Sequence, residues 1–373
     1  MNRAAKVSIV DIAIFCMVMK NFMESSATIP SVGIVDDLCV LLYIVCVVAL
    51  IIKKKYKAKA LILIGAVSVA LLYTSVITGY SDPIITFLFI VAIKDKDIDS
   101  IIEKIYRCYC IMLVAHIICT ISFAWMGNIR MVMHIRGIDR YTLGFIHPNA
   151  TGSKFFAIMM LNLWVKKYKK SKLVFWAIAS TIVYFFCKSR TAYILSLITI
   201  ILVYMVRTKN VWIMKSINKI ASVAFPGMAA VIYALIRMYE HRNPIAVAIN
   251  AVLSGRINLA AYALDRVGFT ILGRSIDFYG PLSSYSAKYA LNDFTFDCIY
   301  SFIFCNMGLV YLVVLSILFF KLAIKKMVWV NASIIIWSLY AVTEVSGLNG
   351  FGLFPIFYLV LLINEKTLKM ELG

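Results

Sequence analysis

Twelve apolar stretches, each long or nearly long enough to cross a lipid bilayer, constrain what this 373-residue chain can fold into. A bilayer core about 30 Å thick is crossed by a helix of about 20 apolar residues. Apolar residue types make up 62% of the chain and the mean hydropathy is +0.90, which is far above the values of soluble domains. The stretches lie near residues 8–26, 34–52, 60–79, 82–94, 106–127, 148–165, 172–187, 190–206, 217–237, 297–320, 327–343 and 350–364.

This pattern predicts an all-α polytopic membrane protein with about twelve transmembrane helices, in which residues 1–373 form one integral membrane domain. The first stretch follows Arg3 and Lys6, as a signal peptide would. However, Glu24 stands where a cleavage site would need small residues, so we expect an uncleaved anchor. The fourth stretch is short and is expected to tilt or to insert halfway.

The basic residues indicate how the chain is oriented in the membrane. If the N-terminus is cytoplasmic, the stretches on the cytoplasmic side, such as "KKKYKAK" and "KKYKKSK", carry 25 of the 38 basic residues. Cytoplasmic segments of membrane proteins carry an excess of lysine and arginine. The net charge of +20 is therefore explained by topology rather than by nucleic-acid binding, and both termini are expected in the cytoplasm.

The two basic residue types are divided unequally between the two sides. The cytoplasmic side has 22 lysines and 3 arginines, whereas the outer side has 4 lysines and 9 arginines. Arginine presents a planar fork of donors that binds carboxylates and phosphates bidentately. The bias favours a phosphate ligand at the outer face. Codon usage and arginines that reach lipid phosphates are the alternative explanations.

Several outer polar residues stand where a helix is expected to begin. The stretch "HIRGIDRYTLGFIHPNATGSKF" ends with His147 and Asn149 around a helix start at Pro148, and "CKSRTAY" places Arg190 in a first turn. Asp297 is expected to open a later helix in the same orientation. Helix N-termini carry free N–H groups and the positive end of the helix dipole, so these positions are typical of anion sites.

The longest outer segment, 238–296, is predicted to be an extracytoplasmic loop with two short amphipathic helices. "NPIAVAINAVL" is expected to open at Asn243-Pro244, and "SGRINLAAYALDRV" is expected to be capped by Ser254. The second helix places Arg256 in its first turn. "ILGRS" then breaks the chain at Gly273. A helix pair on the outer leaflet is suited to cover a site at membrane level.

The ordered motifs "HIRGIDRYTLGFIHPNATG", "CKSRTAYI", "LSGRINLAAYAL", "TILGRS" and "FDCIYSFIFCNMGLVY" resemble those of bacterial Wzy-type polysaccharide polymerases, within the O-antigen ligase-like group. The resemblance covers about residues 100 to 364 and includes the position of the long loop. One departure is Cys298, which stands where that family usually has asparagine.

The resemblance implies a GT-C-type membrane glycosyltransferase that acts on lipid-linked substrates at the outer face of the bacterial plasma membrane. It would transfer a growing glycan from undecaprenyl diphosphate onto a repeat unit on the same lipid. The catalytic candidates, either of which would orient or deprotonate the acceptor hydroxyl, are His147 and Asp297. The candidates for binding the diphosphate and the glycan are Arg136, Arg140, Asn149, Arg190, Arg256, Arg274 and Tyr300. Structural alternatives for the catalytic pair are a helix-start role for His147 and a dipole-complementing charge for Asp297.

The sequence predicts no metal site, because no cluster of histidine, cysteine and aspartate has ligand spacing, and no cofactor. Expected partners are the lipid-linked oligosaccharide, membrane lipids, and a chain-length regulator and a flippase of the same pathway. Two other functions stay open: a ligase that moves finished glycan to another acceptor, and a flippase or other transporter. A transporter is expected to place its polar groups near mid-bilayer, whereas here they gather outside.

The lysine distribution makes a direct prediction about topology. A cysteine placed at Ser284 should react with an impermeant maleimide in intact, wall-permeabilised cells, whereas a cysteine at Lys169 should not. The parent protein, with its nine native cysteines, is the control. Reversed labelling would overturn the assignment of every outer residue above.

Overall fold

The computed structural model describes residues 7–29, 33–127, 129, 131–135, 137–165, 170–277, 280–286, 289 and 291–363. Arg136 and Lys169, both used in the expectations above, lie outside these residues. The described chain is mostly helical and divides into two compact units, which we describe separately. The first comprises Met1–Tyr56 and Leu88–Tyr204, and the second comprises Lys57–Phe87 and Met205–Gly373.

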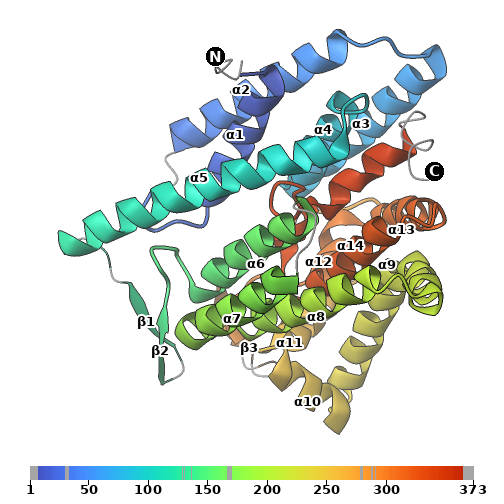
Figure 1. Cartoon of the computed structure of the whole chain (residues 1–373). Coiled ribbons are helices and arrows are strands. Elements are labelled where there is room, and N and C mark those ends of the chain that lie inside the picture. Colours follow the sequence, from blue (N-terminus) through green and yellow to red (C-terminus); the bar gives the residue numbers. More distant parts are fainter. Residues whose placement is uncertain are drawn as a thin grey trace. The chain divides into compact units, whose positions relative to one another are not determined.

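The first unit is built from helices, four of them long and apolar enough to cross a membrane, and one β-hairpin (Figure 1). The strands β1 and β2 pair in antiparallel register, with Val132 opposite Tyr141. The elements are α1 (Ile9–Met23), α2 (Gly33–Ile52), the end of α4 (Asp82–Ala92), α5 (Ile98–Trp125), β1 (Val132–Ile135), β2 (Ile138–Tyr141), α6 (Pro148–Val165), α7 (Lys170–Cys187) and most of α8 (Arg190–Arg207).

The second unit contains the longest helix and the segment that was expected as an outer loop. Its helix α9 packs against both α13 and α14. The elements are α3 (Ala58–Thr78), α9 (Val211–Glu240), α10 (Pro244–Val252), α11 (Arg256–Val267), β3 (Gly280–Ser286), β4 (Leu291–Phe294), α12 (Ile299–Phe302), a π-turn η1 (Ile303–Met307), α13 (Leu309–Ala323), α14 (Val328–Tyr340), and two 3₁₀ segments, η2 (Val345–Leu348) and η3 (Phe354–Leu362).

Among the described residues, six helices are long and apolar enough to cross a membrane, which supports an all-α, multi-pass membrane protein. These six are α2, α3, α5, α7, α8 and α9. The pair α10 and α11, bent by 114°, would be a seventh by length and composition. Each of the twelve predicted stretches contains a helix, but several of those helices are shorter than a span, so the number twelve stays a prediction.

The stretch 297–320 was expected to be one continuous helix, and the structure corrects this expectation. It is divided into α12, the π-turn η1 and α13. The break at Gly308 has φ +99°, and a Cβ there would lie 2.5 Å from the carbonyl oxygen of Ile271. The N–H of Thr270 donates to the carbonyl of Phe304 (3.0 Å), and that of Leu309 donates to the carbonyl of Thr270 (2.8 Å). Backbone groups that the broken helix releases are thus satisfied by a neighbouring segment, as an apolar environment requires.

Of the three helix starts predicted in and after the long loop, the start of α10 is confirmed and those of α11 and α12 differ from the prediction. The side chain of Asn243 caps α10 by accepting the N–H of Ile245 (3.0 Å), as predicted. The expected cap Ser254 is not the cap of α11, because the chain turns at Gly255, with φ +92° and no side-chain cap. Asp297 does not open α12 either, since it lies two residues before the first helical residue, Ile299.

A buried polar cluster fixes the turn before α6 in the first unit. The ring of His116 stacks on Phe145, with centroids 4.1 Å apart. Its Nε2 lies 3.0 Å from the carbonyl oxygen of Leu143, which can only accept, so Nε2 carries the proton and Nδ1 accepts from the Ser26 hydroxyl (3.3 Å). The carbonyl of Gly144 accepts N–H groups from the segment after α1. The turn that leads into α6 is therefore held by both α5 and the end of α1.

This turn generates a stability prediction. Gly144 has φ +82°, and an added Cβ would collide with the side chain of Thr120. Gly144→Ala should therefore lower the free energy of unfolding by about 1–3 kcal/mol more than Gly137→Ala does. Gly137 is the matched control, because it has a similar φ of +75° and nothing within 4 Å of its Cβ position. The measurement is thermal unfolding of the purified proteins in detergent, and equal losses would contradict the close packing of this turn.

Candidate functional site

His147 lies just before α6 and accepts hydrogen bonds from the first turn of that helix. Its Nδ1 accepts the backbone N–H of Asn149 (3.1 Å), and its carbonyl accepts the N–H of Ala150 (3.0 Å). Pro148 is the first helical residue, where the absence of an N–H is harmless. In a neutral imidazole whose Nδ1 accepts, the proton resides on Nε2, which then acts as a donor. The geometry favours a hydrogen-bond donor over a general base.

Arg190 is the first residue of α8 and is exposed. The residue before it, Ser189, is buried against α6, where a Cβ on Gly152 would lie 2.6 Å from the Ser189 hydroxyl oxygen. The close approach of these two helices sets the start of α8 beside the first turns of α6. The half-buried Asn149 is in the first turn of α6. These residues belong to one unit, so the structure brings His147, Asn149 and Arg190 to the same end of the α6–α8 pair.

The β1–β2 hairpin carries Arg140, whereas the candidate Arg136 lies outside the described residues. The Nε of Arg140 is buried and makes no hydrogen bond among the described residues. Asp139, which was considered as a partner for one of these arginines, instead pairs with His134 across the hairpin, with Nδ1 and Oδ1 2.9 Å apart. Among the described residues, the Nε of Arg140 therefore remains without a hydrogen-bond acceptor.

In the second unit, Arg256 is buried, with only 4% of its surface exposed. Its Nε donates to the carbonyl of Thr343 (2.9 Å), and its Nη1 donates to the carbonyl of Leu253 (3.2 Å). Two carboxylates complete the arrangement, with Glu344 3.5 Å from Nη2 and Asp297 3.8 Å from Nε. We call Arg256, Asp297 and Glu344 the Arg256 cluster. Arg256, which was expected to bind the diphosphate, is thus already bound by protein groups. To bind an external anion, Arg256 would have to give up some of these contacts.

The Arg256 cluster joins three parts of the second unit. Arg256 begins α11, Asp297 precedes α12 and Glu344 follows α14. The Asp297 side chain is 40% exposed and that of Glu344 is 24% exposed. A buried guanidinium thus holds two carboxylates that reach the surface. Sequence reasoning missed Glu344, although an ionisable residue beside the apolar stretch 327–343 was a usable signal.

Two other predicted residues occupy structural positions. Tyr300 is fully buried, donates its hydroxyl to the carbonyl of Ser338 (2.8 Å) and packs on Phe225, with centroids 5.3 Å apart. Arg274 is exposed, but its Nη1 donates to the carbonyl of Val267 (2.8 Å) and its backbone pairs with Asn306. Direct substrate contact by Tyr300 would require its hydroxyl to leave the core.

The described residues contain no group of three or more histidine, cysteine, aspartate or glutamate side chains that would hold a metal ion. Comparisons with protein-family models, with curated proteins and with solved structures found no match to this chain. The geometry of the α6–α8 ends and of the Arg256 cluster therefore carries the functional argument.

The environments of the two principal arginines predict opposite effects of the same substitution. Arg256→Lys removes two of the donors that satisfy buried carbonyls, so it should lower the free energy of unfolding by about 1–3 kcal/mol. Arg190→Lys should leave stability unchanged, because Arg190 is exposed. Thermal unfolding of both variants in detergent makes the comparison. An Arg256→Lys protein as stable as the parent would mean that the contacts of the Arg256 cluster do not stabilise the purified protein.

Proposed function

We propose that this protein is a glycosyltransferase of the bacterial plasma membrane that polymerises polysaccharide repeat units carried on undecaprenyl diphosphate. The observation that carries the proposal is the Arg256 cluster, in which a buried guanidinium holds the partly exposed carboxylate of Asp297. A carboxylate in this position is suited to orient and deprotonate an acceptor hydroxyl. The ordered motifs of the polymerase family and the arginine-rich outer segments support the same function.

The proposed reaction transfers the growing chain from its carrier to a new repeat unit. The acceptor hydroxyl oxygen bonds to the anomeric carbon of the donor glycan, while the bond from that carbon to the diphosphate oxygen breaks. Its electron pair leaves with the diphosphate, and the hydroxyl proton passes to Asp297. In the first unit, Arg190 and the N–H groups at the start of α8 are suited to bind the diphosphate of the carrier.

The proposal includes a topology and partners. Both termini are placed in the cytoplasm and residues 238–296 outside, with the shorter apolar helices completing about twelve spans. A flippase that supplies repeat units and a chain-length regulator are the expected protein partners. In the proposed reaction, undecaprenyl-diphosphate-linked oligosaccharide is both the donor and the acceptor.

Glycan analysis of a deletion strain separates this function from a ligase and from a transporter. Loss of a polymerase leaves single repeat units attached to their final carrier. Loss of a ligase leaves long chains on undecaprenyl diphosphate, and loss of a flippase traps repeat units on the cytoplasmic side. Long carrier-linked chains or trapped units would therefore reject the proposal.

A single substitution tests the assigned base. Asp297→Asn keeps the size of the side chain and removes the proton acceptor, so polymer formation should fall by about 10²-fold or more. Purified protein is given lipid-linked repeat units, and polymer per minute is normalised to folded protein.

The matched control is Asp277→Asn, an exposed aspartate in the predicted outer segment 238–296, which should keep near-normal activity. Full activity of the Asp297→Asn protein would remove Asp297 from the mechanism. The search for the acceptor would then move to Glu344.

A further inference from the structure

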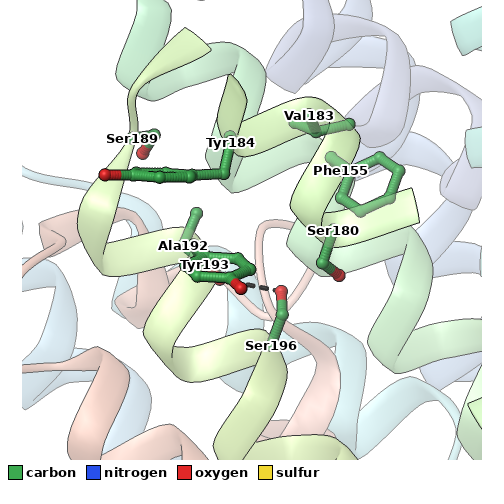
Figure 2. A pocket seen from close by; sticks show the side chains of 9 residues that line it. Phe155, Ser180, Val183, Tyr184, Ser189, Ala192, Tyr193 and Ser196 are labelled. Carbon is green, nitrogen blue, oxygen red and sulfur yellow. Dashed lines mark hydrogen bonds between the residues drawn. The ribbon is translucent and has the colours of Figure 1, made fainter. Parts of the chain in front are cut away.

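Basic side chains gather on the surface of the second unit, at the end where α8 and α13 finish and α9 and α14 begin. A surface is the relevant place for a ligand, because the recess between α6, α7 and α8, beside the stacked rings of Tyr184 and Tyr193, holds only about one water molecule (Figure 2). The exposed basic residues at this end of the second unit, which we call the basic surface, are Arg207, Lys209, Lys215, Lys219, Lys321 and Lys326.

Contacts between distant parts of the chain bring the segments of the basic surface together. The guanidinium of Arg207 lies over the ring of Trp329, 5.2 Å from its centroid, which joins the end of α8 to the start of α14. The side-chain amide of Asn331 donates to the side chain of Asn218 in α9 (2.7 Å) and to the carbonyl of Ala323 in α13 (2.9 Å). The lysines that flank these contact residues therefore share one end of the second unit.

The segments that form the basic surface contain no acidic residue. Residues 205–220 and 318–331 are all described, and neither segment includes an aspartate or a glutamate. In the first unit, by contrast, the lysines after α2 have carboxylates near them, and Lys54 pairs with Asp95 (3.2 Å). Membrane topology depends only on the sign of the charge, so it does not require the excess found in the second unit. This excess positive charge favours an anionic ligand.

Exposed apolar side chains among these lysines indicate that the ligand is a lipid. Trp212, in the first turn of α9, is 79% exposed, and the Nζ of Lys215 lies 5.7 Å from its ring centroid. Ile324, which lies between Lys321 and Lys326, is also exposed. Tryptophan and lysine are typical of the boundary between lipid and water. The 30 residues of α9 span about 45 Å, whereas a bilayer core is about 30 Å thick, so the first turns of this helix fit the head-group layer.

We propose that the basic surface binds the phosphate head groups of anionic phospholipids. The inference does not depend on the proposed function. Lysine and arginine donate charge-assisted hydrogen bonds to phosphate oxygens, while Trp212 and Ile324 contact the upper part of the acyl chains. A soluble acidic protein or a nucleic acid would match the charge but would leave these two apolar side chains without an apolar partner. Bound lipids would also fix the depth of α9, against which α11, α13 and α14 pack.

The test measures lipid binding to the purified full-length protein. The protein in detergent is titrated with phosphatidylglycerol or with phosphatidylcholine of the same acyl chains, and bound lipids are counted by native mass spectrometry. We expect phosphatidylglycerol to bind more tightly. A triple variant, Lys209→Gln with Lys215→Gln and Lys219→Gln, should weaken the binding of phosphatidylglycerol roughly tenfold or more and leave that of phosphatidylcholine unchanged.

The matched control removes three charges from exposed lysines of the first unit, by Lys53→Gln, Lys55→Gln and Lys96→Gln, and should bind phosphatidylglycerol like the parent. Lys321→Gln with Lys326→Gln is the second test variant, for the case that the triple variant does not fold. Equal binding of the two lipids, or an equal loss in the control, would overturn the inference. Displacement of the lipid by inorganic phosphate or polyglutamate at the same concentration would also overturn it, because the ligand would then be a soluble anion.

Discussion

In an apolar surrounding, every backbone N–H and C=O must find its partner within the protein, and this constraint governs the structure. Helices meet it internally, so the described chain is mostly helical. Where a helix is broken or the chain turns, other segments supply the partners. Thr270 pairs with Phe304 inside the π-turn and with Leu309 after it, and the carbonyl of Gly144 accepts N–H groups from Ala27 and Thr28. Such segments have little conformational freedom, because each backbone group that is not paired within a helix needs a specific neighbour as its hydrogen-bond partner. The turn at Gly144 leads directly to His147, so a rigid backbone positions that candidate side chain.

The same constraint applies to buried charge and separates the basic residues of the predicted outer segments into two kinds. Arg256 is satisfied by two carbonyls and two carboxylates, and the Nζ of the nearly buried Lys154 donates to the backbone oxygen of Asn21 (2.7 Å). Removing one partner of a buried ion pair typically costs about 3–5 kcal/mol, because a charge is left without compensation. Arg256 is therefore a buried cation whose partners belong to the chain itself. Arg190 is exposed, so its guanidinium is accessible to an external ligand.

Hydrophobic periodicity predicted a helix in every apolar stretch, and local cap chemistry predicted the starts of α6 and α10. These features depend on neighbours along the chain, which a sequence displays. The π-turn and the η3 segment depend instead on close approach between distant residues, as at Gly308 and Ile271, and periodicity carries no trace of such contacts. Glu344 was missed for a related reason. Its partner Arg256 is 88 residues away, so only the folded chain shows that the two charges meet.

The arginine bias of the segments predicted to lie outside shows where sequence reasoning about a site reaches its limit. Residue type predicts which ligands a side chain prefers, but burial decides whether the ligand is external or part of the protein. For Arg256 the carboxylates belong to the chain, whereas Arg190 is exposed at a helix N-terminus. Free N–H groups and the positive end of the helix dipole favour an anion at such a position. The start of α8 is therefore a stronger candidate than Arg256 for binding an external anion.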